Sequence, residues 1–271
     1  MSADVFLAAA GPDSENTHSL PATAAATSGA SQPAVAETGP STPRPRQTRW
    51  FGRQRPTEPV RQAPTTVDLV PEDLRAACRA ALRRPGSVQP RSVAVTSTVR
   101  QEGRTTVALT CALVEQEEHG RSTVLLELDL DRPGLGQVLG LSPRPGVAEL
   151  LRGQVTLDET LTWITPQLGV VLGGVAPDPA RLLLAFRHSG LLAELEQAGY
   201  GVVADLPPVS PGHHGDRVVD LFDEVVLVVT AGATPLELVR GATLMLPRPP
   251  ALLLNGTSSS VPRWIRRPLG L

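Results

Sequence analysis

The segment from Ser92 to Thr106, SVAVTSTVRQEGRTT, constrains the fold of this chain more than any other stretch, because three local structures follow one another within it. The β-branched run at residues 92–97 predicts a buried strand, residues 98–103 predict a short polar loop, and a helical pattern begins after the loop. A strand that passes through such a loop into a helix is the layout of a phosphate-binding loop. The segment therefore predicts an α/β fold.

The chain continues this alternation of strands and helices. Helical patterns occupy residues 71–84, 105–119, 180–199 and 235–246, with Gly190 expected inside the third helix, and apolar runs typical of strands occupy residues 122–130, 168–174, 200–206, 224–230 and 251–255. Strands that form continuous apolar runs between helices favour a mostly parallel sheet with helices on both faces. We therefore predict a P-loop NTPase-like domain at residues 67–256.

Two terminal segments are predicted to be disordered. Residues 1–66 hold too few large apolar side chains to offset the chain entropy of folding, and the prolines of residues 257–271 leave too few residues for a helix. From Arg44 to Arg55, five arginines surround Trp50 and Phe51 with no acidic residue. Two hypotheses are open for this segment: peripheral contact with an anionic membrane surface, or a solvated linker, which its prolines favour.

The composition excludes some classes of function. A net charge of −2 and an aromatic content of 3% provide neither a basic surface nor stacking platforms, so we expect no nucleic-acid partner. Cys78 and Cys111 lack metal-ligand spacing and a nearby partner, which predicts buried thiols of a reduced compartment. No run of about 18 apolar residues and no basic N-terminal region occur, which predicts a cytoplasmic protein. Segment 44–55 is the candidate for its recruitment to the inner face of the membrane.

Polar side chains follow several of the predicted strands. Glu127, Asp129 and Asp131 end the second strand, Asp205 ends the fourth, and Asn255 ends the last. Because ligands of parallel sheets bind beyond the carboxyl ends of the strands, we expect these side chains to face the phosphate loop. Carboxylates hold Mg²⁺ directly or through its water, so the arrangement predicts a magnesium nucleotide site.

The sequence GHHGD at residues 212–216 is a second candidate site. His213 and His214 lie beside Asp216, which suggests a metal site, but no third ligand is spaced to complete one. Adjacent histidines on a loop also point in different directions. A solvated loop is the favoured interpretation.

Three motifs in this order resemble those of the bacterial tyrosine kinases that act as cytoplasmic partners of polysaccharide co-polymerases, a branch of the MinD/ParA-type P-loop ATPases. TSTVRQEGRTT at 96–106 is similar to the family loop TSxxPGEGKST, LLELDLDRP at 125–133 to LLIDADLRRP, and DLPP at 205–208 to DTPP. GGVAPDPARLLLAFRHSGLLAEL at 173–195 resembles a stretch that the kinases carry and the partitioning ATPases lack. The resemblance covers about residues 71–256.

The resemblance implies ATP or ADP and Mg²⁺ as cofactors and assigns roles to the matching residues. The implied cofactor-binding residues are Gln101, Glu102, Gly103, Arg104, Thr105 and Thr106 in the loop and Asn255 near the adenine. The implied catalytic residues are Arg104, in the place of the phosphate-binding lysine, with Glu127 and Asp129 as the paired acids of the second motif. The implied magnesium ligands are Thr105, Asp129 and Asp205.

The chain departs from the family pattern where nucleotide chemistry is most demanding. Gln101 replaces a glycine that lets the backbone approach the phosphates, and Arg104 replaces a lysine with a longer, planar cation. Arg100, Glu127 and Asp131 replace a proline, an aspartate and an arginine. These departures predict impaired nucleotide binding.

Two further departures concern assembly and regulation. The kinases end in a tyrosine cluster, whereas this chain has the single Tyr200, expected to be buried at a strand start, so we expect no autophosphorylation of a tyrosine tail. The family's ring-forming helix carries Glu-x-x-Arg-x-x-Arg; here Glu72 and Arg75 fit, but Cys78 occupies the third position. Homo-oligomerisation therefore stays open.

Our leading hypothesis is a regulatory pseudo-enzyme of exopolysaccharide (capsule) synthesis and export, which binds a membrane polysaccharide co-polymerase or an active kinase paralogue. An alternative is a working ATPase that uses Arg104 in the lysine role. Another is a positioning or scaffold protein of the MinD/ParA type, with surface contact through segment 44–55.

Overall fold

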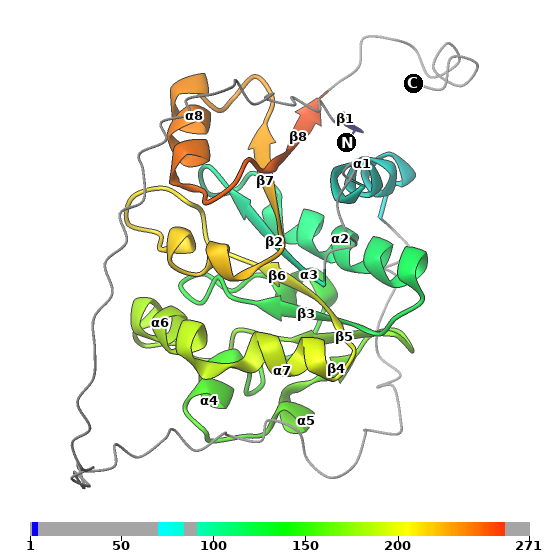
Figure 1. Cartoon of the computed structure of the whole chain (residues 1–271), viewed down its shortest axis with the longest axis vertical. Helices are drawn as coiled ribbons and strands as arrows, with labels where there is room; N and C mark the ends of the chain where they lie inside the picture. The colour runs from blue at the N-terminus through cyan, green and yellow to red at the C-terminus, as the bar shows by residue number, and fades with distance from the viewer. Residues whose placement is uncertain (1, 5–69, 84–90, 258–271) are drawn as a thin grey trace, which may run out of the picture. The chain divides into compact units, whose positions relative to one another are not determined.

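The computed structural model describes residues 2–4, 70–83 and 91–257 (Figure 1). They form an eight-stranded sheet in the order β1-β8-β7-β2-β6-β3-β5-β4. The parallel strands are β2 (Ser92–Ser97), β3 (Thr123–Glu127), β5 (Leu168–Val171), β6 (Gly201–Asp205), β7 (Glu224–Thr230) and β8 (Ala251–Thr257). Two short strands, β1 (Ser2–Asp4) and β4 (Thr162–Trp163), pair antiparallel at the edges. The mostly parallel sheet predicted from the sequence is confirmed.

Helices cover both faces of the sheet. In β2, Val93 and Val95 pack into one hydrophobic cluster and Ala94 into the other, because successive side chains of a strand point to opposite faces. The cluster of Val93 receives side chains from α1 (Glu72–Leu82), α2 (Arg104–His119) and α3 (Leu135–Leu139). The cluster of Ala94 receives them from α4 (Val147–Leu151), α5 (Leu157–Thr160), α6 (Pro179–Ser189), α7 (Leu191–Gln197) and α8 (Leu236–Met245). Burial on both faces explains why the strands form continuous apolar runs.

The helix predicted over residues 180–199 is two helices in the structure. Gly190 has a φ of 74° and ends α6, and α7 begins directly after it. A right-handed helix cannot continue through a residue in the left-handed region, and glycine enters that region without steric cost. The prediction that Gly190 is tolerated inside one helix is therefore wrong.

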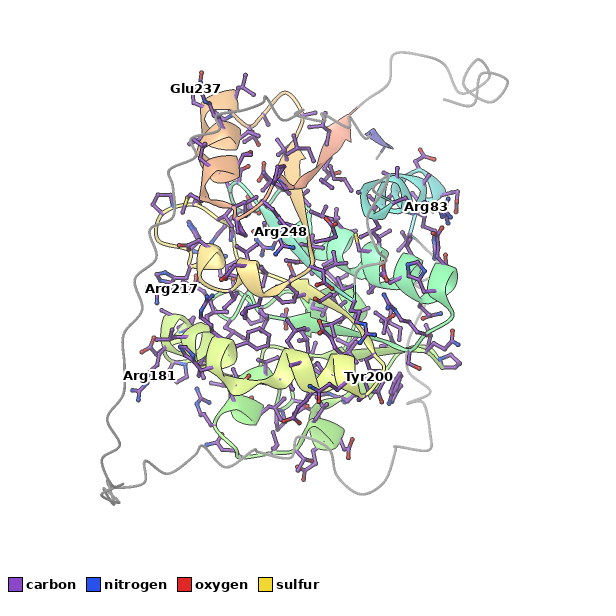
Figure 2. The ribbon with its side chains drawn as sticks, in the orientation of Figure 1. Arg83, Arg181, Tyr200, Arg217, Glu237 and Arg248 are labelled. Atoms are coloured by element: carbon purple, nitrogen blue, oxygen red, sulfur yellow. The ribbon has the colours of Figure 1, made fainter. Side chains whose placement is uncertain are left out.

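Three further side chains differ from their predicted environment. Cys78 and Cys111 are buried as expected, but each has the other as a partner, because α1 packs on α2 and a thiol hydrogen bond joins them. This hydrogen bond, followed by burial, raises the pKa of Cys111 well above its usual range. Tyr200 is half-buried beside Trp163, with ring centroids 6.3 Å apart, rather than buried (Figure 2).

The short elements between β3 and β5 were not predicted. Helices α3, α4 and α5 and strand β4 have two to five residues each, too few to show a hydrophobic period. The 3-10 turns Gly215–Arg217 and Val219–Leu221 were also not predicted.

Several predictions concern residues that the structure does not describe. Residues 2–4 form β1, whereas residues 5–69 and 258–271 lie outside the described residues. Residues 2–4 thus differ from the disorder predicted for residues 1–66. Disorder of the terminal residues that the structure does not describe, and membrane contact through Arg44 to Arg55, stay predictions. In the part of the chain that is described, no helix is long and apolar enough to span a membrane.

Candidate functional site

The loop between β2 and α2 has a backbone path that favours glycine at two positions. Gly103 has a φ of 82°, and a Cβ atom there would lie 2.3 Å from Nδ2 of Asn255. Gln101 has a φ of 66°, although it carries a side chain. A non-glycine residue in this region costs of the order of 1 kcal/mol. Gln101, which replaces a family glycine, therefore has a backbone conformation that favours glycine.

Glu102 fastens this loop to the neighbouring strands. Its buried carboxylate accepts hydrogen bonds from the backbone N–H of Val99 at 2.8 Å, the N–H of Thr230 at 3.0 Å and the hydroxyl of Thr234. Its carbonyl accepts a hydrogen bond from Nδ2 of Asn255 at 2.9 Å. The side chains of Glu102 and Asn255 thus hold the loop against the ends of β7 and β8. Their contact with a nucleotide stays a prediction.

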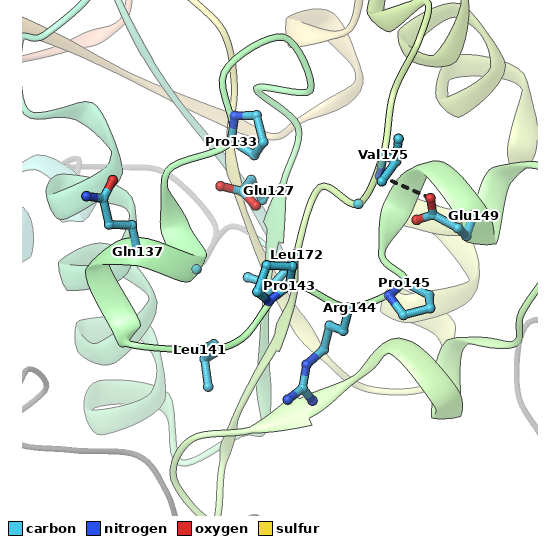
Figure 3. Close-up of a pocket in the computed structure, with 12 residues that line it drawn as sticks. Glu127, Pro133, Gln137, Leu141, Pro143, Arg144, Pro145, Glu149, Leu172 and Val175 are labelled. Atoms are coloured by element: carbon cyan, nitrogen blue, oxygen red, sulfur yellow. Dashed lines mark hydrogen bonds between the residues drawn. The ribbon is translucent and has the colours of Figure 1, made fainter.

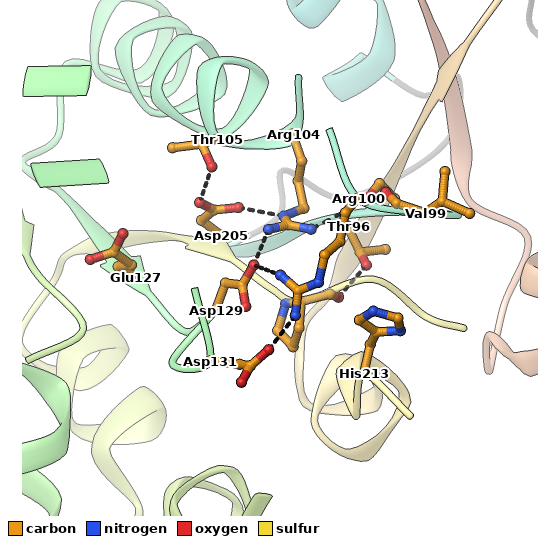
Figure 4. Close-up of polar contacts among 12 residues, drawn as sticks. Thr96, Val99, Arg100, Arg104, Thr105, Glu127, Asp129, Asp131, Asp205 and His213 are labelled. Atoms are coloured by element: carbon orange, nitrogen blue, oxygen red, sulfur yellow. Dashed lines mark hydrogen bonds and ion pairs between the residues drawn. The ribbon is translucent and has the colours of Figure 1, made fainter. Parts of the chain in front are cut away.

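Arg104, the first residue of α2, lies at the centre of the site (Figure 4). Its side chain is buried, and its guanidinium donates from Nε to Oδ1 of Asp205 at 2.8 Å. The two Nη atoms donate to Oδ2 of Asp129 and, at 3.2 Å, to Oγ of Ser97. The guanidinium therefore bridges the two aspartates that the sequence predicts as magnesium ligands.

The other groups of the site complete this cluster. The Thr105 hydroxyl donates to Oδ2 of Asp205 at 2.7 Å, so both carboxylate oxygens of Asp205 are bonded. Arg100 donates to Oδ2 of Asp129 at 3.3 Å and to Oδ2 of Asp131 at 2.6 Å. Two departures from the family pattern, Arg100 and Asp131, thus pair with each other.

Burial and charge shift the pKa values within the cluster. For Arg104, burial alone lowers the pKa, but the charges of Asp205 and Asp129 outweigh it and the pKa is raised. For Asp205, burial raises the pKa because desolvation outweighs the opposing effects of Arg104 and Thr105. Arg104 therefore stays protonated and supplies a fixed positive charge between the aspartates.

Most oxygen atoms of the predicted magnesium ligands are already hydrogen-bonded within the protein. Asp205 has no unbonded oxygen, and the Thr105 hydroxyl is turned toward it. Oδ1 of Asp129 is buried and has no hydrogen-bond partner among the described residues. Over the same residues, no group of three or more His, Cys, Asp or Glu side chains is placed to hold a metal ion. As folded, these residues do not fit the ion well, because the Arg104 guanidinium bonds to both aspartates.

Glu127 lies outside the hydrogen bonds of the Arg104 cluster (Figure 4). Its buried carboxylate accepts from the backbone N–H of Leu135 at 2.6 Å and of Gly173 at 2.7 Å. Burial raises the pKa of Glu127, and these two hydrogen bonds oppose the shift. The predicted pair of Glu127 and Asp129 is therefore split: Asp129 faces Arg104, and Glu127 is held by backbone amides.

The backbone after β3 explains this separation. The N–H groups of Leu128 and Asp129 both donate to the carbonyl of Asp205, at 2.9 and 3.0 Å. Two successive donors on one acceptor interrupt the regular ladder, so the side chains of Glu127 and Asp129 no longer follow the alternation of a strand. Asp129 is thereby placed beside Asp205.

The remaining predicted residue, Thr106, is exposed, and its carbonyl accepts from the Thr110 hydroxyl. Sequence analysis missed the contact of Ser97 with Arg104 and the pairing of Arg100 with Asp131. The second pairing had a signal, because Arg100 and Asp131 are both departures and carry opposite charges. The first had none beyond the place of Ser97 at the end of β2.

The histidines of residues 212–216 lie close to this cluster. Nδ1 of His213 is 3.1 Å from Oγ of Ser210, and His214 has a φ of 66°. Both line a cavity of about 190 Å³ that Asp129 and Asp131 also line. The two rings thus belong to a loop at the edge of the candidate site.

Comparisons with known proteins point to one group of relatives. The chain is 27% identical over 162 residues to the succinoglycan biosynthesis transport protein ExoP of Rhizobium meliloti (strain 1021), which covers 56% of this chain and 20% of ExoP. It is 27% identical over 151 residues to the tyrosine-protein kinase YwqD of Bacillus subtilis (strain 168), which covers 55% of this chain and 63% of YwqD. The chain thus spans about a fifth of one relative and less than two thirds of the other. No family model matches the chain.

A solved structure supports the same relationship. The kinase domain of VpsO superposes with a TM-score of 0.61 at 27% sequence identity, over 68% of this chain and 95% of that domain. The agreement covers most of the described residues, so the parallel sheet and its helices are common to both proteins.

Proposed function

Because this chain is homologous to bacterial tyrosine kinases of the capsule co-polymerase family, we propose that it is a nucleotide-binding-impaired regulatory partner of the membrane machinery for exopolysaccharide (capsule) synthesis and export. It would act at the cytoplasmic side by binding a membrane polysaccharide co-polymerase or an active kinase paralogue. The observation that carries the proposal is the Arg104 guanidinium, which bridges Asp129 and Asp205.

The physical reason is the cost of opening this cluster. A nucleotide with Mg²⁺ would need Arg104 to release at least one aspartate, and separating a buried ion pair leaves a charge without compensation at a cost of about 3–5 kcal/mol. Phosphate oxygens would offset part of this cost. The planar guanidinium is also a poor substitute for a compact ammonium in a tight phosphate loop. The side chain of Gln101 also opposes binding, because it stands where backbone should approach the phosphates.

The proposal is tested by thermal denaturation of the purified chain with and without Mg-ATP and Mg-ADP. A ligand at 100 times its dissociation constant adds about 2.7 kcal/mol of stability, so binding would give a clear shift. We expect no shift at millimolar nucleotide for the wild type. The double variant Gln101→Gly, Arg104→Lys is the matched gain-of-binding control and should shift with Mg-ADP. A clear shift of the wild type would contradict the proposal.

A second candidate function, a working ATPase with Arg104 in the lysine role, has one observation in its favour. The fold still brings Arg104, Thr105 and Asp205 together, and Oδ1 of Asp129 remains without a described partner. Phosphate release by the wild type with Mg-ATP, compared with Asp205→Asn, separates the candidates. The regulatory proposal expects equal background rates, whereas a rate lost in Asp205→Asn would establish the ATPase.

The partner requires its own test. The genes beside this one are expected to include chain-length, flippase or glycosyltransferase genes of polysaccharide export, and their absence would count against the proposed pathway. A positioning protein of the MinD/ParA type rests on Arg44 to Arg55, which lies outside the described residues. Deleting this segment should abolish focal localisation if that alternative holds, and unchanged localisation would reject it.

A further inference from the structure

Most of the large apolar side chains that are exposed among the described residues lie on one helix. Val175 lines a cavity of about 480 Å³ beside Glu127 (Figure 3), and Leu184 lies on α6. The other four all belong to α8, and they are Leu236, Leu238, Leu244 and Met245. Neighbouring exposed apolar side chains of this kind mark an interaction surface.

The four apolar side chains of α8 form two stripes along the helix. Leu236 and Leu244 lie on one stripe, with an arginine between them, because residues four apart in a helix share a face. Leu238 and Met245, seven residues apart, form the second stripe. Gly241 lies between the stripes, and a Cβ atom there would meet nothing within 4 Å. The surface between the stripes is therefore open to a bound side chain.

The last of the described residues lie near the start of this helix. β7 and β8 end side by side, since Thr230 pairs with Asn255 and the N–H of Ala231 donates to the carbonyl of Asn255 at 2.8 Å. α8 begins at Leu236, shortly after the end of β7 (Figure 1). Residues 258–271 therefore leave the sheet at the edge where α8 begins.

The sequence of residues 258–271 provides apolar side chains within reach of α8. Trp264 and Ile265 lie within eight residues of the end of β8. Eight extended residues span up to about 26 Å, whereas a ten-residue helix is about 15 Å long. Both side chains can therefore reach any part of the two stripes.

The α8 surface suits a short segment better than a second copy of the chain. A ten-residue helix presents a face of about 15 by 10 Å. A stable interface between two proteins buries about 800 Å² on each partner, which is several times this area. One buried aromatic side chain contributes about 150–250 Å², so Trp264 by itself matches the size of the α8 surface.

We propose that residues 258–271 dock on the exposed face of α8, with Trp264 between the two apolar stripes and Ile265 beside it. Docking removes apolar surface of both partners from water. The entropic cost of closing the loop is small, because few residues separate Trp264 from the end of β8. The contact orders part of a segment that the sequence predicts to be disordered, and it does not depend on the nucleotide site.

The test uses the full chain labelled with 5-fluorotryptophan, whose fluorine NMR spectrum has one signal for each of its three tryptophans. Trp264→Phe assigns the signal of Trp264 by removing it. The change in this signal between light and heavy water measures the exposure of the ring. This change should be smaller in the native chain than in concentrated urea. It should stay the same on dilution, because the contact lies within one chain.

A variant of α8 tests the location. The double variant Leu236→Ser, Leu244→Ser removes one stripe, and these side chains are 76% and 79% exposed, so the variant should fold. In this variant, the solvent effect on the Trp264 signal should rise to its value in urea. Leu184→Ser, which replaces an exposed leucine of α6, is the matched control and should leave the signal as in the wild type.

Three results would overturn the proposal. A Trp264 ring as exposed in the native wild type as in urea would show that the segment does not dock. Protection that survives the loss of Leu236 and Leu244 would place the contact elsewhere. Protection that disappears on dilution would identify a second copy of the chain as the partner.

Discussion

At position 104, a guanidinium reaches two carboxylates and a hydroxyl at once, and it neutralises charges that would otherwise be exposed to a metal or to water. Arg104→Met should therefore destabilise the protein by about 3 kcal/mol or more, because Asp129 and Asp205 would stay buried without their counter-charge. Urea denaturation measures the loss as a lower midpoint at an unchanged slope.

The matched control for this prediction is Arg187→Met. Arg187 also donates two hydrogen bonds to one aspartate, Asp220, at 2.6 Å each, but both side chains are about one third exposed. Exposed ion pairs contribute little because water screens them, so the loss should be much smaller than at Arg104. Equal losses of stability in the two variants would show that the buried Arg104 cluster contributes no more to stability than an exposed ion pair.

Gln101 is a residue where the backbone, rather than a contact, determines the effect of a substitution. Gln101→Gly should raise the free energy of unfolding by about 1 kcal/mol, since glycine adopts the observed φ of 66° without strain. Thr106→Gly in the first turn of α2 is the control with the opposite expectation, because glycine lowers the stability of a helix. Chemical denaturation measures the change in the free energy of unfolding for both variants. A lower value for Gln101→Gly would refute the strain.

At the scale of elements, Gly190 separates α6 from α7 through its φ of 74°. Gly190→Ala should destabilise the protein by about 1 kcal/mol, because no neighbouring atom lies within 4 Å of the new Cβ and only the backbone resists the change. Gly134→Ala is the control, since its Cβ also meets nothing and its φ is −126°. Thermal denaturation should show a lower midpoint in Gly190→Ala and little change in Gly134→Ala.

Ion pairs join the α1 region to α2 within this chain. Arg75, Arg79 and Arg83 of the α1 region all bond to Glu117 or Glu118 of α2, with Nε of Arg79 at 2.7 Å from Glu118. The family's ring-forming pattern falls on this same helix, and Arg75, the arginine of the pattern that this chain retains, already has a partner in Glu117. Homo-oligomerisation stays a prediction. An oligomer that used these arginines would first have to break their ion pairs with α2.

At the scale of the whole molecule, buried carboxyl groups with raised pKa values set part of the pH dependence of stability. The unfolded Glu127 titrates near its ordinary pKa of about 4.3, whereas the folded group holds its proton to higher pH. Its contribution to stability is therefore complete below about pH 4.3 and is lost as pH rises through the folded pKa. The free energy of unfolding of Glu127→Gln, minus that of the wild type, should thus increase with pH above about 4.3.

Glu159 provides the control of opposite sign. The pKa of this exposed group is lowered by hydrogen bonds from the backbone and side chain of Thr156. Its contribution is present above about pH 4.3 and is lost as pH falls through the folded pKa, so the difference for Glu159→Gln should decrease as pH rises. Denaturation curves over a series of pH values measure both differences, and equal signs would contradict the assignment of the shifts.

The sequence alone determined the order of the main elements and the parallel sheet. Strands such as β2 and β7 are buried on both faces, so the central residues of each strand are apolar, and this signal is independent of distant residues. The loop from residue 98 to 103 was recognised for the same reason, since its turn lies between a strand and a helix that are adjacent in sequence. Gly190 was misread because the same residue type is compatible with a helix interior and with a helix end.

Only the tertiary structure decided what the loop does. Arg104 lies 25 residues from Asp129 and 101 from Asp205, so no local pattern reveals that one guanidinium bonds to both. Likewise, the backbone after β3 turns Glu127 toward the N–H groups of Leu135 and Gly173 and away from the cluster. Local patterns determine elements because helices and strands form from neighbouring residues. The site depends on strand ends that meet only when the sheet is assembled. There Arg104 bonds to Asp129 and Asp205, and Thr105 bonds to Asp205.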